Sequence, residues 1–389
     1  MTRRPFDVDA LIIGAGPAGA VAALVLARAG ARVRVYEAGP LPRHRLCGEF
    51  VSPEGVADLT ALGIDLRRVG GFELARASVS AGRAQADGAL PAPGVAIARF
   101  ALDAELARFA AAQGAEVITR TRVTALAGSL AQGFEAHTAG STTDRVRARC
   151  VIGAFGRHPL ALHALRRPAA ARLSVAFKMH RVGPHGLPPR VELHAFEDGY
   201  VGFSPLSPER VNVCWVAQQS IIRTLRGGGD AAPFLRAGAG VQPLQALLAC
   251  TQEDPAARCA ESGVQFGAPR PVWQDVLLAG DAAVTPHPLS GDGMAMGVRA
   301  GRFAAAYALA FLREDLPAAA VPEAYARAWR REFSSRLRWD SALHALLERP
   351  AMVTPMLRIL GRWPAAFEAL VTRTRGRALL QSPTVEVPR

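Results

Sequence analysis

The sequence predicts an α/β fold made of a discontinuous Rossmann-type nucleotide-binding domain, an inserted antiparallel-sheet domain and a C-terminal helical segment. Three observations predict it. The chain opens with a strand, a glycine-rich turn and a helix; a second strand, glycine loop and helix stand far downstream; and strands of alternating hydrophobicity lie between them. With 389 residues the chain is long for a single core, so two lobes are expected.

The first glycine motif lies in "DVDALIIGAGPAGAVAALVLARAGARVRVYEAG", which predicts strands over 9–13 and 32–36 and a helix over 18–29. Gly14 permits a tight turn, Gly16 lets the backbone approach a pyrophosphate, and Gly19 allows close helix–strand packing. Glu37, 23 positions beyond Gly14, is placed to accept hydrogen bonds from ribose hydroxyls. This order predicts a dinucleotide site, with Ala18 at the opening of its helix.

The second motif lies in "VWQDVLLAGDAAVTPHPLSGDGMAMGVRAGRFAAAYAL", where a strand over 276–279 precedes a glycine loop and a long alanine-rich helix. Asp281 is placed to bind a polyol chain, which favours FAD over NAD(P) because nicotinamide dinucleotides have no ribitol. The N–H groups at the start of the helix can stabilise negative charge on a flavin ring. The cofactor-binding residues predicted here are Gly280, Asp281, Pro288, Gly291, Asp292 and Gly293.

Between the two motifs, β-type alternation predicts strands over 72–80, 173–181, 190–196 and 210–217, which we expect to form an antiparallel floor for a substrate chamber. "RGGGDAAPFLRAGAG" is expected to be a surface loop. The pattern turns helical from Val321, where Trp329, Trp339 and Trp363 suggest helix packing, with lipid or greasy-substrate contact as the alternative. The predicted boundaries are 1–70, 96–168 and 266–320 for the nucleotide domain, 71–95 and 169–265 for the substrate domain, and 321–389 for the helical segment.

The amino-acid composition limits the classes of molecule that we expect the protein to bind. The net charge of +13 comes almost wholly from arginines spread along the chain, which indicates a solvated basic surface and not a nucleic-acid footprint. Attraction to an anionic substrate or an acidic carrier protein stays open. The five cysteines include no CxxC pair, so neither disulfides nor a metal site is predicted. No apolar run reaches ~18 residues, so we expect no membrane-spanning helix. We expect a cytoplasmic protein, and peripheral membrane contact stays open.

The stretch "RHRLCGEFVSPEG" places Cys47 between basic residues and a Gly-Glu turn. A lone cysteine is more often a small buried hydrophobe than a reactive group, and both interpretations stay open. His287, in the second glycine loop, and His44 are the other acid–base candidates. Ser52 followed by Pro53 has the pattern of a helix N-cap with proline at the first helical position.

Three blocks together carry a family resemblance: "IIGAGPAGAVAA", "HRLCGEFVSPEG" and "GDAAVTPHPLSGDGMAMGVRAG". The chain resembles flavoproteins of the p-hydroxybenzoate-hydroxylase fold, and within them the geranylgeranyl-reductase-like branch and the FAD-dependent oxidoreductases of polyketide pathways. The resemblance implies that Arg99, in "RFALDAELARFAAAQGAEV", lies near the flavin, with Arg45, Cys47, Gly48 and Glu49 at the substrate side of its ring. One departure is Phe155–Gly156, where many monooxygenases of the fold have Asp-Gly, which puts the usual NADPH-linked control of flavin movement in doubt.

These observations predict an FAD-dependent oxidoreductase that takes electrons from NADPH or NADH and acts on a hydrophobic natural product, either free or tethered to a carrier protein. Two reactions stay open. Hydroxylation of an aromatic or polyketide ring by a monooxygenase of secondary metabolism is slightly favoured, because most enzymes of the fold do that. Reduction of a C=C bond is the alternative, in which Cys47, His287 or Arg45 would assist.

Two further classes are ranked lower. A flavin halogenase would need a lysine beside a halide tunnel and a Trp-x-Trp-x-x-Pro motif, and the sole lysine, Lys178, lies in another segment. A non-catalytic FAD-binding module is disfavoured because the phosphate, ribose and flavin motifs are all intact.

Overall fold

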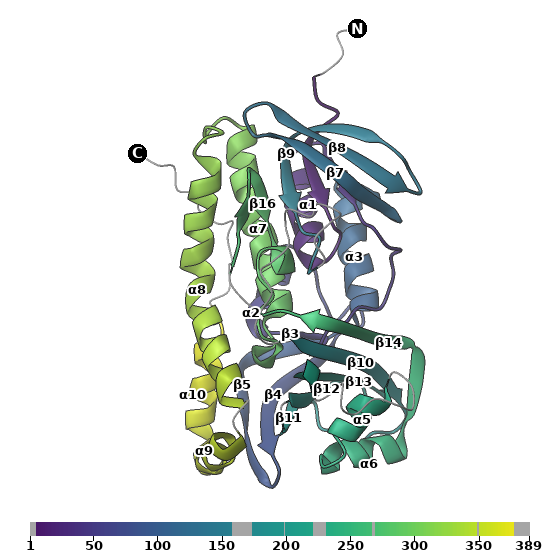
Figure 1. Ribbon diagram of the computed structural model, residues 1–389, viewed down its shortest axis with the longest axis vertical. Helices are drawn as coiled ribbons and strands as arrows, with labels where there is room; N and C mark the ends of the chain where they lie inside the picture. Colours follow the sequence, from purple (N-terminus) through teal and green to yellow (C-terminus); the bar gives the residue numbers. More distant parts are fainter. Residues whose placement is uncertain are drawn as a thin grey trace.

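The fold is seen in a computed structural model, which describes residues 5–157, 173–197, 199–220, 231–266, 269–347 and 350–376. Two β-sheets lie one above the other, and a long C-terminal helix runs beside both of them (Figure 1). The predicted domain boundary at 168–169 lies outside the described residues, and the other boundaries stay predictions. The α/β fold class with a helical C-terminal segment is confirmed.

The first sheet is a Rossmann-type core with strand order β15-β16-β9-β1-β2-β6. β1 pairs in parallel with both β2 and β9, and β7 and β8 extend the sheet from β9 as an antiparallel hairpin. Its strands are β1 (Val8–Ile13), β2 (Val33–Tyr36), β6 (Glu116–Ile118), β7 (Thr121–Ser129), β8 (Gly133–Gly140), β9 (Arg145–Gly153), β15 (Val272–Trp273) and β16 (Val276–Leu278).

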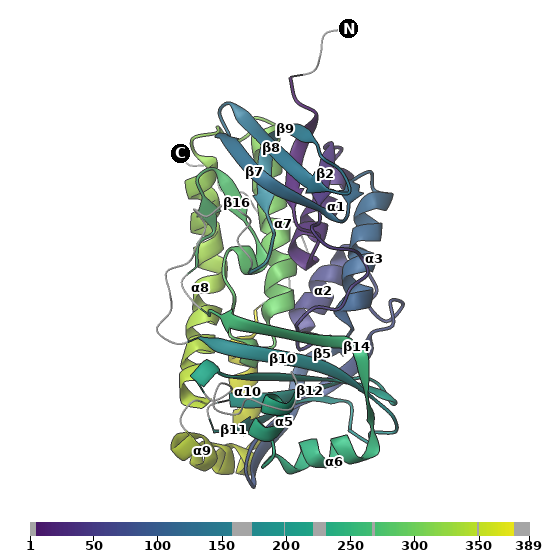
Figure 2. The same ribbon diagram turned by 45° about the vertical axis from the view of Figure 1, so that its right-hand side comes forward.

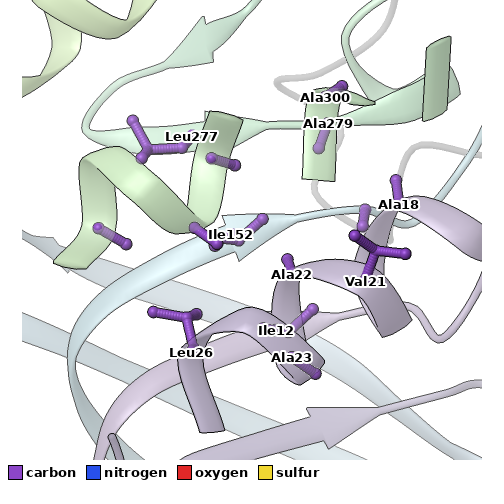
Figure 3. Packing of buried hydrophobic residues seen from close by; sticks show 14 of the residues in the cluster. Ile12, Ala18, Val21, Ala22, Ala23, Leu26, Ile152, Leu277, Ala279 and Ala300 are labelled. Carbon is purple, nitrogen blue, oxygen red and sulfur yellow. The ribbon is translucent and has the colours of Figure 1, made fainter. Parts of the chain in front are cut away.

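Helices cover this sheet with small side chains that allow close approach. Alanines of α1 lie against Ile152 of β9, and Leu277 of β16 belongs to the same continuous apolar core (Figure 3). Because β9 and β16 come from segments far apart in the sequence, the nucleotide-binding unit is discontinuous, as predicted. The helices around this sheet are α1 (Pro17–Arg28), α2 (Pro53–Ala61), α3 (Arg99–Ala112) and α7 (Gly293–Leu312).

The second sheet has strand order β14-β10-β13-β12-β11-β4-β5-β3. All its pairs are antiparallel except β4 with β11, which run parallel, so the expected antiparallel floor holds with one exception. Its strands are β3 (Phe50–Val51), β4 (Phe72–Ala81), β5 (Ala84–Ala96), β10 (Ser174–Val182), β11 (Arg190–Phe196), β12 (Gly199–Ser207), β13 (Arg210–Gln218) and β14 (Gln252–Val264).

Alternate residues of these strands face two different environments, as the period of two requires. On one side Phe177 and Trp215 pack with Phe234 of the short helix α5 (Ala232–Ala237), and α6 (Gln242–Cys250) lies close by (Figure 2). The surface-loop prediction for 226–240 was therefore wrong over Ala232–Ala237, where Pro233 starts a helix and Phe234 is buried; residues 226–230 lie outside the described part.

The C-terminal helices are α8 (Val321–Leu347), α9 (Pro350–Arg362) and α10 (Pro364–Thr374). The packing role predicted for the tryptophans is confirmed for Trp329, which is 1% exposed. It was wrong for Trp339 and Trp363, which are 37% and 66% exposed. Within the described residues, no helix combines the length and hydrophobicity that crossing a bilayer demands.

Candidate functional site

The first glycine turn is shaped by close backbone contacts. Gly14 has a positive φ of 104°, and a Cβ on Gly19 would lie 1.9 Å from the Gly14 carbonyl oxygen. α1 begins directly after Gly16, so the N–H groups of its first turn have no intrahelical acceptor. A Cβ on Gly16 would meet only the Arg99 guanidinium, at 3.7 Å. Free N–H groups, a helix N-terminus and a nearby cation fit the pyrophosphate of a dinucleotide.

Glu37 lies buried directly behind this turn, at 3% exposure. Its carboxylate accepts hydrogen bonds from the N–H groups of Ala15 (2.9 Å) and Gly39 (3.0 Å), and pairs with Arg43 (2.6 Å) and Arg45 (3.1 Å). Burial raises the pKa of Glu37, but Arg45, the two N–H groups and Arg43 lower it, and the net pKa lies below its ordinary value. An ionised acceptor at this position fits the adenosine ribose of FAD.

Arg45 therefore has its charge compensated within the protein. Its guanidinium lies 3.1 Å from Glu37 and 3.4 Å from Asp103. Burial lowers the pKa of Arg45, while those two carboxylates raise it. The resemblance placed the Arg45 side chain at the substrate side of the flavin ring. In the structure it pairs instead with Glu37, the predicted ribose-binding residue.

The second glycine motif meets the first through α7. A Cβ on Gly301 would lie 2.2 Å from the Ala18 carbonyl oxygen, and a Cβ on Gly280 would lie 3.0 Å from the Ala18 side chain. Asp281 follows Gly280 and lies 3.9 Å from Arg157. Two segments more than 260 positions apart therefore contact one another, backbone against small side chains. A small cavity beside Asp281 lies between the start of α7 and the C-terminal helix α8, and its lining includes Pro286, Gly293, Trp329 and Phe333.

The loop before α7 carries His287, Pro288, Gly291 and Asp292. Gly291 has a positive φ of 68° and lets the chain turn into α7 at Gly293. The Asp292 carboxylate, predicted to bind cofactor, pairs with Arg375 of the C-terminal segment at 2.7 Å.

His287 packs among aromatic rings. Its ring stacks on His344 with centroids 3.9 Å apart, and Phe266 lies 4.5 Å away. Burial, and then the neighbouring His344, lower the pKa of His287 to about 3. The imidazole is therefore neutral at neutral pH, which weakens its case as a proton donor.

Arg99 connects the glycine turn to Cys47. Its guanidinium makes two bonds to the Asp103 carboxylate, at 2.6 and 2.7 Å, which fix it on α3. Burial lowers the pKa of Arg99, but Asp103 and then Cys47 raise it, and the net pKa lies above its ordinary value. Arg99 thus faces Gly16 on one side and Cys47 on the other.

A buried ionic cluster lies behind the Cys47–Gly48–Glu49 turn, built from residues that are 0–1% exposed. Glu49 accepts one hydrogen bond from the Lys178 ammonium and one from the Arg99 backbone N–H (2.8 Å) on Oε1, and contacts His180 Nε2 through Oε2 at 2.6 Å. Burial raises the pKa of Glu49, but His180 and Lys178 outweigh that effect, so the net pKa lies below its ordinary value.

This cluster also holds Glu49 in the left-handed region, at φ 56°, which an unsupported glutamate rarely adopts. His44, Glu49 and His180 offer ligand atoms within 4.8 Å of one another, a spacing suited to a metal ion. Lys178, however, already supplies a positive charge to the Glu49 carboxylate. We therefore describe the group as an ion-pair cluster.

Cys47 itself is half-buried at the junction of the two lobes. Its sulfur accepts a hydrogen bond from the Glu49 N–H at 3.3 Å, and its carbonyl accepts one from the Asn212 side chain of β13 at 3.1 Å. Lys178 donates to the neighbouring Arg45 carbonyl at 3.2 Å. Two strands of the second sheet therefore fix the backbone on either side of the thiol.

Sequence reasoning missed Asp340, which belongs to α8 and is 3% exposed. Burial raises the pKa of its carboxyl to about 7, although the Ser290 hydroxyl and loop backbone at 287 and 290 lower it. The buried Tyr200 phenol of β12 lies near it, and burial raises the pKa of that phenol well above 10. The helical period could have revealed Asp340, because it lies one turn before His344 on the side of α8 that contains the buried Phe333 and Arg336.

The described residues thus define a two-sheet flavin-nucleotide-binding protein with a thiol at the lobe junction. The FAD binding domain family matches residues 7–221, which is more than half of the chain, and the protein belongs to that family. It is an FAD-dependent oxidoreductase, and the resemblance seen in the sequence is confirmed.

Curated relatives match over most of the chain. A menaquinone reductase of Mycolicibacterium smegmatis is 28% identical, covering 76% of this chain and 75% of the relative. A digeranylgeranylglycerophospholipid reductase of Methanopyrus kandleri is 26% identical, covering 86% and 85%. Among solved structures, a geranylgeranyl bacteriochlorophyll reductase-like protein of Thermoplasma acidophilum is 18% identical with a TM-score of 0.78, covering 94% of this chain and 95% of that chain.

Proposed function

We propose that this oxidoreductase reduces a carbon–carbon double bond in the isoprenoid chain of a lipid, with NADPH or NADH as electron donor. The observation that carries the proposal is the half-buried Cys47 thiol at the lobe junction, one arginine away from the glycine turn. Support also comes from the two reductases of isoprenoid lipids that match over three quarters of the chain or more.

The protein's residues would divide the work as follows. The glycine turn and Glu37 hold the nucleotide, and the segments around Asp281 and Gly293 hold the rest of FAD. Bound FAD supplies the two-electron chemistry of the reaction. Cys47 gives a proton to the substrate carbon that completes the reduced bond, and the resulting thiolate regains a proton from solvent. The cation of Arg99 stabilises that thiolate while it lasts.

The ion-pair cluster would position the Cys47 thiol and would take no part in proton transfer. Bonds to both Glu49 oxygens fix the turn, and the Glu49 N–H bonded to the Cys47 sulfur would then hold the thiol in one orientation. His287, held neutral among rings, and Arg45, bonded to Glu37, are left as binding and packing residues in this proposal. Oxygen-dependent hydroxylation, which the sequence slightly favoured, becomes the rival that the experiment must exclude.

The reaction is tested by reducing the purified holoenzyme with NADPH, and separately with NADH, under anaerobic conditions before adding menaquinone in detergent. The expected result is a product formed without oxygen that is still heavier by two hydrogens after the quinone ring has been reoxidised, because only a reduced bond of the side chain keeps the added hydrogens. A product that requires oxygen and gains one oxygen atom would show a monooxygenase instead and overturn the proposal.

The role of Cys47 is tested by Cys47→Ser. The variant is expected to keep bound FAD and lose turnover by roughly 100-fold, the usual scale for removing a general acid. Cys250→Ser, at an exposed cysteine of α6, is the matched control and should retain full turnover. Equal turnover of both variants would return Cys47 to a structural role.

A further inference from the structure

Helix α9 carries apolar side chains on two opposite sides. Val353 and Leu357 are 0% and 1% exposed and pack into the core of the second sheet. Met352 and Ile359, on the outer side, are 52% and 55% exposed, and Trp363 directly after the helix is 66% exposed. A surface helix normally has one apolar side, so the outer one needs an explanation.

Met352 and Ile359 lie on one side of α9, because they are seven residues, or two helical turns, apart. We call these two side chains and the exposed Trp363, which stands directly after the end of the helix, the apolar stripe. They are the largest hydrophobic side chains exposed anywhere on the described part of the chain apart from Phe100 and Trp339. Three of the five thus gather within twelve residues.

The surroundings of this stripe are basic. Residues 350–376 contain four arginines and a single acidic residue, Glu368. Arg358, Arg362 and Arg373 are exposed, whereas Glu368 accepts a hydrogen bond from the Ala89 backbone N–H at 2.8 Å. Tryptophan and aliphatic side chains flanked by arginines are the composition of helices that lie in the interface of an anionic bilayer.

The inner side of α9 connects this surface with the flavin-facing loops. The apolar cluster that includes Val353 and Leu357 also contacts Leu46, next to Cys47, and Leu289, in the loop before α7. α9 and α10 lie at the end of the molecule opposite the N-terminus, beside the second sheet (Figures 1 and 2). The exposed side of α9 is therefore joined through one apolar cluster to the segments on either side of the proposed site.

From this arrangement we propose that α9 and the start of α10 dock the protein on an anionic lipid bilayer, with Met352, Ile359 and Trp363 inserted and the arginines on the headgroups. The inference deepens the proposed function, because it states how a membrane-resident isoprenoid lipid reaches the site.

The full-length holoenzyme is sedimented with vesicles of phosphatidylcholine alone and of phosphatidylcholine with about 30% phosphatidylglycerol, a composition that gives the bilayer a negative surface potential. Binding is expected with the anionic vesicles and should weaken as salt is added. Ile359→Ser with Trp363→Ser should lower the partition coefficient at least tenfold. Arg358→Glu with Arg362→Glu should abolish the preference for phosphatidylglycerol.

A matched charge control is Arg122→Glu with Arg313→Glu, an exposed arginine of β7 and another directly after the end of α7, and it should bind like the parent protein. Retained flavin absorbance and circular dichroism establish that each variant is folded. Equal binding by the α9 variants and the control would overturn the proposal. Loss of a dimer in the α9 variants, without vesicle binding by the parent, would assign the stripe to self-association and overturn it as well.

The readouts separate this inference from the proposed function. Vesicle binding without double-bond reduction would refute the reductase and leave the docking surface standing. Double-bond reduction in detergent by a protein that ignores anionic vesicles would refute the docking surface alone.

Discussion

The glycine turn and the ion-pair cluster lie on either side of Arg99, and they are built in opposite ways. At the turn the packing depends on missing side chains, because Gly19 and Gly301 allow backbones to touch. The cluster, in contrast, is held together by its side chains, since Glu49 is fully buried and bonded to both Lys178 and His180, which are buried as well. The first region depends on steric exclusion and the second on charge compensation, so each should fail in its own way when altered.

The largest effect is expected from Gly19→Ala. The added methyl group would lie 1.9 Å from the Gly14 oxygen and 3.1 Å from the Ala154 side chain, so α1 must shift away from β1. We expect no folded, FAD-containing protein, as measured by flavin absorbance after purification. Gly240→Ala, at a glycine with no atom within 4 Å of the added methyl, should purify with flavin. A yellow Gly19→Ala protein would show that the turn is not sterically closed.

A smaller but still large effect is expected from Lys178→Met, which removes the ammonium partner of the buried Glu49 and leaves that carboxylate with His180 and the Arg99 N–H. Losing one partner of a buried ion pair costs about 3–5 kcal/mol in the free energy of unfolding, measured here by urea denaturation. Adding Glu49→Gln removes the uncompensated charge, so the double variant should be more stable than the sum of the single losses predicts. Additive losses would mean that the two side chains act independently.

The last expected effect is a gain in stability and concerns Asp340, whose carboxyl is buried but not ion-paired in the way that Glu49 is. Its folded pKa of about 7 is above the unfolded value of 3.8, so its contribution to stability is present below 3.8 and is lost as the pH rises through about 7. Asp340→Asn removes that loss and should raise stability by about 4 kcal/mol at pH 8, with a smaller gain at pH 5.

Thermal unfolding at the two pH values, with the exposed Asp315→Asn as control, checks this expectation. A gain that is larger at pH 5 than at pH 8 would contradict the assigned direction of the pKa shift.

The glycine turn was readable in the sequence because spacing alone specifies it. GxGxxG, Glu37 and the Gly280–Asp281 pair each fix a local backbone shape, and the elements they predict agree with the structure to within one or two residues. The C-terminal helices could also be predicted, because the helical pattern of the sequence from Val321 onward is local as well. Pro233 and Phe234 misled us because the glycines on both sides of them suggested a loop, while burial of Phe234 favours a helix.

The ion-pair cluster was not readable, because its members meet only in the folded chain. Lys178 lies 129 positions from Glu49, and it drew attention only as the sole lysine. Its strand alternates between two faces, and nothing local says which face meets the Cys47 turn. Asp340 was missed for a different reason: it stands in a helix rich in charge, and only the helical period that it shares with the buried Phe333 and Arg336 separates it from its exposed neighbours.

The two-residue strand β3, which directly follows Glu49, pairs with β5 and so belongs to the second sheet. The segment that carries Cys47 therefore leaves the nucleotide lobe and ends inside the second sheet, the lobe to which the proposed function assigns the substrate. Under that proposal, any remodelling of the second sheet for a different lipid would move the thiol together with the new binding surface. The substrate range could then diversify while the proposed alignment between the reacting carbon and the thiol is inherited unchanged.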